Sequence, residues 1–70
     1  MTNIKNLFGN KIRKTRQQMK MSQENLGFKS GLHRTYISEV ELGRRNVSLE
    51  NIRKISKALG IKISDMFRGL

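Results

Sequence analysis

Cysteine and proline are absent from the 70-residue chain, histidine and tyrosine occur once each, and only five residues are acidic. Without cysteine there are no disulfides and no thiolate metal sites, and a single histidine, His33, excludes a histidine-rich metal cluster. The five acids are scattered over different predicted helix faces, so no nucleophile–base pair and no metal-ligand spacing is found. We therefore expect neither an enzyme nor a protein with a metal or cofactor.

Long apolar runs are also missing. No stretch approaches 18 consecutive apolar residues, which excludes a membrane span, and no apolar run follows the N-terminal residues as in a signal peptide. A chain of 70 residues forms one domain at most. Because domains of this size bury a modest core, they usually need a staple or a partner.

Positive charge is the dominant feature of what is present. Lysine and arginine number 15 against five acids, giving a formal net charge of +10 and a pI of about 11.1. Residues 1–35 hold eight basic and one acidic side chain (+7), and residues 36–70 hold seven and four (+3). A charge of this size on so small a body indicates an anionic partner. A disordered basic tail fits poorly, because 36% of the residues are hydrophobic and recur periodically.

Helical spacing of apolar residues predicts helices over residues 4–20, 23–30, 34–42, 49–59 and 65–68. Only the brief Ile61-Lys62-Ile63 alternates, so the predicted fold class is all-α, a compact bundle of five short helices. The expected buried faces comprise Ile4, Phe8, Ile12, Thr15 and Met19 in the first helix and Leu49, Ile52, Ile55, Ser56 and Leu59 in the fourth.

Serines and glycines mark the expected helix ends. Ser22, Ser48 and Ser64 are predicted N-caps, because a serine hydroxyl can accept a hydrogen bond from a first-turn amide. Gly31, Gly43 and Gly60 are predicted to end the second, third and fourth helices. We expect His33 to be a boundary or capping residue and Glu41, on the inner side of the third helix, to be a paired or capped structural acid and not a catalytic one.

The segment 23–42, QENLGFKSGLHRTYISEVEL, has the features of a helix-turn-helix. Gly27 lies four residues before the turn glycine Gly31, where two helices can cross closely. An apolar wedge is available, and the outer face of the second helix of the pair is polar and of hydrogen-bonding size. Such a helix fits the DNA major groove. The wedge consists of Leu26, Leu32, Ile37 and Val40.

The chain resembles the lambda-repressor-like, Cro/C1-type helix-turn-helix family over essentially its whole length. Within that family, the run GLHRTYISEVELGRRNVSLENIRKISKALGI resembles the controller proteins of restriction–modification systems. The resemblance implies a single domain over residues 1–70 with C-terminal dimerisation helices, a homodimer, a palindromic operator and control of the protein's own promoter. The chain departs from the family pattern at two positions: Gly27 replaces the usual alanine, and Leu42 stands where a charged or polar residue is common.

The resemblance also implies roles for individual residues. Base reading falls on Arg34, Thr35, Tyr36 and Ser38, and DNA backbone contacts fall on Gln23, Asn46 and Ser48. The dimer surface maps to Leu49, Met66, Phe67 and Leu70. From charge alone, Lys20, Lys29, Arg44 and Arg45 are interpreted as electrostatic contacts to the DNA backbone.

Each of these side chains has a plainer interpretation. Arg34 can bind guanine O6 and N7 with two hydrogen bonds, or it can contact phosphate or pair with Ser38 or Glu39. Tyr36 can contact phosphate or a flexible base step, or it can be half-buried packing. Thr35, Ser38 and Gln23 can be ordinary surface residues. Glu39 can accept from cytosine N4, hold an arginine in place, or remain solvated.

We therefore predict a sequence-specific DNA-binding transcription regulator in the bacterial cytoplasm, associated with the nucleoid, which blocks or recruits RNA polymerase. An antitoxin-type or phage-type repressor on the same fold is the first alternative. A membrane-active cationic protein is a remote one, because tryptophan is absent and the helices are short, capped and polar.

Overall fold

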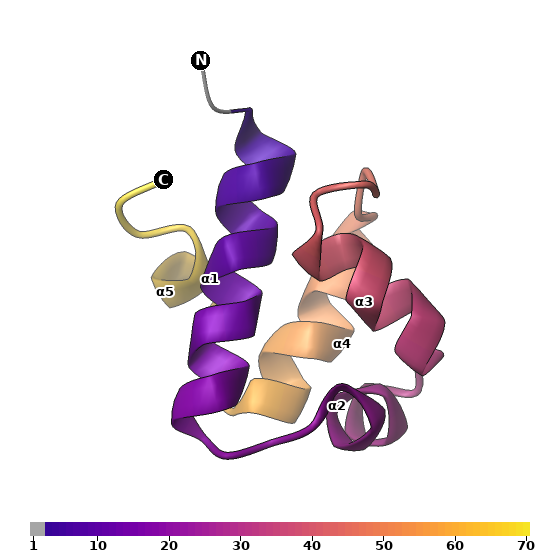
Figure 1. Cartoon of the computed structure of the whole chain (residues 1–70). Coiled ribbons are helices and arrows are strands. Elements are labelled where there is room, and N and C mark those ends of the chain that lie inside the picture. Colours follow the sequence, from indigo (N-terminus) through magenta and orange to yellow (C-terminus); the bar gives the residue numbers. More distant parts are fainter. Residues whose placement is uncertain (1–2) are drawn as a thin grey trace.

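The computed structural model describes residues 3–70, which form five helices and no strand. They are α1 (Ile4–Gln18), α2 (Gln23–Ser30), α3 (Arg34–Glu41), α4 (Leu49–Leu59) and α5 (Ile63–Met66). Figure 1 shows α1 running the length of the molecule, with α3 beside it and α2 crossing below α3. Helix α3 packs on both α1 and α2, α2 also packs on α4, and α5 lies against α1 and α4. The all-α prediction is confirmed.

Side-chain caps begin the first four helices. Asn3, Ser22 and Ser48 accept hydrogen bonds from backbone amides three residues later, at 2.9, 2.9 and 3.1 Å. The Nδ1 atom of His33 accepts from the Thr35 amide at 3.3 Å. Because these acceptors occupy amides that the helix leaves unpaired, they fix where each helix starts. The capping predictions for Ser22, His33 and Ser48 are confirmed.

The helix ends predicted at Gly31 and Gly60 are confirmed, whereas the predicted bounds of the first and last helices are not. Gly31 and Gly60 adopt the left-handed conformation after α2 and α4, as predicted, with φ of 74° and 69°. Helix α1 stops at Gln18 and does not reach residue 20, because Lys20 has a positive φ of 56°. The prediction that Ser64 caps a helix over 65–68 is wrong. Helix α5 begins after Lys62, has no side-chain cap, and contains Ser64.

The core of the described residues contains nine buried apolar side chains drawn from all five helices and the α1–α2 connection. Three residues of the expected α1 face are not among them: Thr15 is half-buried, Ile4 is 54% exposed and Met19 is 46% exposed. Ile4 is the first residue of α1 and Met19 follows its last residue, and Met21 is buried instead. Leu49, expected on the buried face of α4, is 76% exposed. The core consists of Phe8, Ile12, Met21, Leu26, Ile37, Val40, Ile55, Leu59 and Met66.

Two glycines allow α3 to approach its neighbours closely. A Cβ atom on Gly9 of α1 would lie 2.2 Å from the Val40 carbonyl oxygen, and one on Gly27 of α2 would lie 2.7 Å from that of Leu32. Contacts this short are sterically excluded, so both crossings require glycine. The close crossing predicted at Gly27 is confirmed. Gly9, a poor helix former, is explained by packing.

No helix among residues 3–70 is long and apolar enough to cross a membrane.

Candidate nucleic-acid interface

Three of the four predicted base-reading residues lie together on the outer surface. Arg34 and Thr35 are exposed at the start of α3, and Ser38 is half-buried one turn later. With Gln23, the first residue of α2, these three side chains line one shallow hollow. The hollow therefore brings together a predicted backbone-contacting residue from one helix and predicted base-reading residues from the other.

The chemistry of this hollow is that of hydrogen-bond recognition. It offers a guanidinium, two hydroxyl groups and an amide, and no carboxylate lines it. Within residues 3–70, Arg34 makes no ion pair or side-chain hydrogen bond, so the expected alternative of pairing with Ser38 or Glu39 is not realised. An exposed arginine at the start of a helix is able to present both terminal nitrogens to a base edge or a phosphate.

Tyr36, the fourth predicted base reader, faces a different neighbourhood. Its ring is half-buried against the core, and its hydroxyl accepts a hydrogen bond from the side-chain Nδ2 of Asn51 in α4 at 3.1 Å. The Arg45 guanidinium lies over the ring, 5.1 Å from its centroid. These contacts match the half-buried packing alternative. A contact between Tyr36 and DNA stays a prediction.

The loop between α3 and α4 carries Arg44, Arg45 and Asn46, all exposed. The Nε atom of Arg45 donates a hydrogen bond to Glu39 Oε1 of α3 at 2.6 Å. Glu39 therefore holds an arginine in place, one of the roles expected for it. Ser48 uses its hydroxyl oxygen to cap α4. Lys29 is exposed in the last turn of α2.

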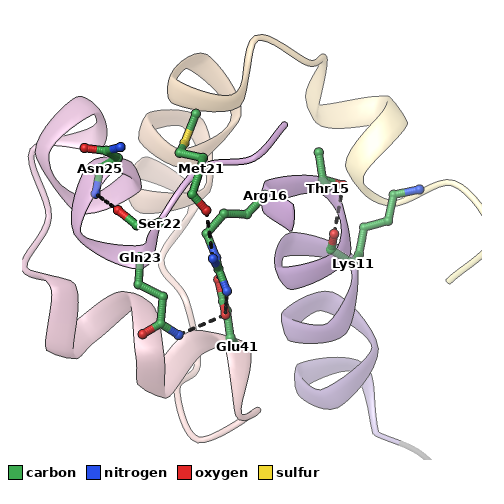
Figure 2. Close-up of polar contacts among 8 residues, drawn as sticks. All are labelled: Lys11, Thr15, Arg16, Met21, Ser22, Gln23, Asn25 and Glu41. Carbon is green, nitrogen blue, oxygen red and sulfur yellow. Dashed lines mark hydrogen bonds and ion pairs between the residues drawn. The ribbon is translucent and has the colours of Figure 1, made fainter. Parts of the chain in front are cut away.

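A buried polar network links Gln23, which lines the hollow, to Arg16 and Glu41 (Figure 2). Glu41 Oε2 accepts from Arg16 Nε at 2.6 Å, and Glu41 Oε1 accepts from a terminal nitrogen of Arg16 and from Gln23 Nε2, both at 3.0 Å. The other terminal nitrogen of Arg16 donates to the Met21 carbonyl at 2.8 Å. Glu41 and Arg16 side chains are only 2% and 11% exposed. The network therefore joins α1, the start of α2 and the end of α3.

Glu41 is the paired structural acid that the sequence predicted, whereas its partner Arg16 was missed. Arg16 follows the buried Ile12 by four residues, so it lies on the inner face of α1, and this spacing was the available signal. Because the pair is nearly out of contact with water, its complete set of hydrogen bonds is needed to offset the cost of burying two charges. The network also orients the Gln23 side chain toward Glu41, at the edge of the hollow.

The predicted dimer surface is only partly on the outside of the molecule. Leu49 is 76% exposed, and Phe67 and Leu70 are half-buried. Phe67 stacks on Phe8 with ring centroids 5.2 Å apart. Met66 has no exposed surface, so the structure assigns it to the core of the single chain. Ile63, which the sequence reasoning missed, is 36% exposed and lines a hollow with Leu49.

Comparisons with known proteins show the family to which the chain belongs. A helix-turn-helix family model matches residues 12–66. The chain is 58% identical over 65 residues to control protein C.BamHI of Bacillus amyloliquefaciens, covering 91% of this chain and 80% of the relative. It is 48% identical over 68 residues to control protein C.MunI of a Mycoplasma species, covering 96% and 92%.

A solved structure has the same fold. The crystal structure of the restriction-modification controller protein C.AhdI from Aeromonas hydrophila superposes with a TM-score of 0.87 at 47% identity, covering 89% of this chain and 94% of that one. The chain therefore belongs to the Cro/C1-type helix-turn-helix family of DNA-binding transcription regulators, and its relatives include restriction-modification controller proteins.

Proposed function

We propose that this protein binds a palindromic DNA operator as a homodimer and regulates its own promoter within a restriction–modification system. The observation that carries the proposal is the hollow shared by Gln23, Arg34, Thr35 and Ser38. In it, α3 offers hydrogen-bonding side chains on one exposed face, and the start of α2 lies beside them. This is the arrangement in which a helix enters the major groove while its neighbour contacts the backbone.

Two copies are needed to read two half-sites. The half-sites of a palindrome lie about 34 Å apart, one turn of DNA. One chain has a longest dimension of 32 Å and carries a single α3. Leu49 and Ile63, with the half-buried Phe67 and Leu70, supply an apolar surface on α4, α5 and the C-terminus. Covering it with a second copy removes apolar area from water that a 70-residue core leaves exposed.

Backbone contacts supply affinity without regard to sequence. The chain carries a net charge of +10, and exposed Lys29, Arg44 and Arg45 lie on the elements that flank α3. Asn46 and Ser48 precede α4, and Gln23 begins α2, where unpaired helix amides favour a phosphate. Each phosphate neutralised by a lysine or arginine releases counterions, so binding weakens as salt rises.

Regulation then follows from occupancy. A dimer on its operator blocks RNA polymerase or recruits it, depending on where the operator lies relative to the promoter. The restriction–modification context rests on the names of the relatives. For such a regulator, we propose a cytoplasmic location on the nucleoid.

The direct test is a titration of the protein against its own upstream DNA and against a scrambled duplex, at two salt concentrations. The proposal predicts an affinity gap of about 10³ or more that persists at the higher salt. It also predicts two protein chains for each operator. Equal and steeply salt-dependent binding to both duplexes would indicate a general DNA coater and contradict the proposal.

A further inference from the structure

We infer that Glu39 is a positioning residue, which holds the Arg45 guanidinium as a preformed clamp for a DNA phosphate. This inference rests on the proposed DNA-binding function and deepens it. The carboxylate accepts a hydrogen bond from Arg45 Nε at 2.6 Å, and the Tyr36 ring covers one face of the guanidinium at 5.1 Å. The Tyr36 hydroxyl is held in turn by Asn51. The guanidinium is thus fixed on one edge and one face.

The remaining edge of Arg45 is the one that matches a phosphate. Within residues 3–70 the two terminal nitrogens of Arg45 have no hydrogen-bond partner, and 51% of its side chain is exposed. Two parallel N–H groups on a planar guanidinium suit two phosphate oxygens. Glu39 and a phosphate therefore bind different edges of the same guanidinium and do not compete for it.

The position of Glu39 in α3 supports a role of this kind. It lies in the last turn of the helix, where the dipole disfavours an acid and where the helix has no basic residue of its own. It also places a negative charge on an element proposed to approach phosphates. The first effect disfavours the helix and the second disfavours DNA binding. The ordering of Arg45 by Glu39 compensates for them. An arginine on a loop otherwise loses its rotamer freedom only on binding, which weakens the complex.

Positioning of Arg45 and simple charge repulsion predict opposite changes in operator affinity when the Glu39 carboxylate is removed. Glu39→Ala removes a negative charge facing DNA, and yet we expect it to weaken operator binding by about three- to ten-fold, the loss expected for ordering one flexible side chain. Glu39→Gln keeps a carbonyl oxygen that can accept from Nε, and we expect its affinity to stay within about two-fold of the parent. The matched control is Glu24→Ala, an exposed first-turn acid of α2, which should not weaken binding.

A double-substitution cycle places the effect on Arg45. Arg45→Ala should lower affinity and reduce the salt slope by about 0.9, because one phosphate contact is lost. In that background, adding Glu39→Ala should cause no further loss. Glu39→Ala alone should leave the salt slope unchanged, because the contact is still made. If Glu39→Ala and Glu39→Gln both tighten binding, the carboxylate acts only by charge, and if neither changes binding, the carboxylate does not position Arg45; either result shows that the inference is wrong.

A second measurement on the free protein separates failure of this inference from failure of the proposed function. The Arg45 guanidinium lies over the ring of Tyr36, which is the only tyrosine of the sequence, so its NMR signals can be assigned without ambiguity. NMR should show ring-current shifts at the Arg45 side-chain protons in the parent and in Glu39→Gln, and their loss in Glu39→Ala. Absence of such shifts in the parent would overturn the inference even if the operator is bound. If no duplex is bound specifically, both the proposed DNA-binding function and the phosphate contact of Arg45 are wrong. The NMR result still decides whether Glu39 orders the Arg45 side chain.

Discussion

Replacing Glu41 by alanine should destabilise this protein severely. The substitution leaves the Arg16 guanidinium, whose side chain is 11% exposed, with only the Met21 carbonyl as an acceptor. Gln23 loses the partner of its amide group at the same time. Breaking a buried ion pair by removing one partner typically costs about 3–5 kcal/mol, because the other charge stays buried without compensation.

That magnitude is large beside the stability of a chain this small. At roughly 0.05–0.15 kcal/mol per residue, a domain of 70 residues has a total free energy of unfolding of about 4–10 kcal/mol. Glu41→Ala should therefore remove about half of it. The assay is urea unfolding followed by circular dichroism at several protein concentrations, because the proposed dimerisation would add to the apparent free energy of unfolding.

A double substitution shows whether the unpaired charge is responsible. Arg16→Met with Glu41→Leu replaces both charges by apolar side chains of similar size, and we expect it to be far more stable than Glu41→Ala. A loss of less than about 1 kcal/mol in Glu41→Ala would mean that water reaches Arg16 and would refute the reasoning. A double variant as unstable as the single one would also refute it.

Three further perturbations test the packing, the electrostatics and the dimer surface. Gly9→Ala should lower the free energy of unfolding by about 1–3 kcal/mol despite the better helix propensity of alanine, because its Cβ would meet the Val40 carbonyl oxygen at 2.2 Å. Thermal melts measure this loss, and Asn10→Ala on the exposed side of α1 is the control. Lys29→Ala should weaken all duplexes alike and lower the salt slope by about 0.9 in titrations, whereas an unchanged slope would remove Lys29 from the interface. Leu49→Glu should shift sedimentation toward the monomer while the circular dichroism spectrum stays helical; a persistent dimer would mean that the dimer surface lies elsewhere.

Local chemistry explains which parts of the fold could be predicted from sequence. Ser22 and Ser48 are caps because serine before a helical pattern satisfies free amides, and Gly31 and Gly60 end helices because glycine accepts a positive φ. Ser64 has the same local signal, but packing of the neighbouring Met66 places the only turn of α5 around it. There the tertiary contact overrides the local preference.

The parts that could not be predicted depend on contacts distant in sequence. Arg16 and Glu41 are 25 residues apart, and periodicity places each on an inner face without revealing that the faces meet. Leu49 and Met66 are both apolar residues in the last two helices, and only the structure shows that one is 76% exposed and the other fully buried. The spacing of Arg34 and Ser38 places them on one face of a helix, whereas Gln23 joins them through the crossing of α2 and α3.

We propose above that the outer face of α3 reads bases. The most direct measurement compares the affinities of the parent and of Arg34→Ala for a set of operators, each with one base pair changed. We expect the parent to discriminate by about 1–3 kcal/mol at each base pair it reads, and Arg34→Ala to lose this discrimination at one base pair per half-site. If Arg34→Ala weakens every duplex by the same factor and keeps the full pattern of discrimination, Arg34 contacts only the DNA backbone, which would contradict base reading by this residue.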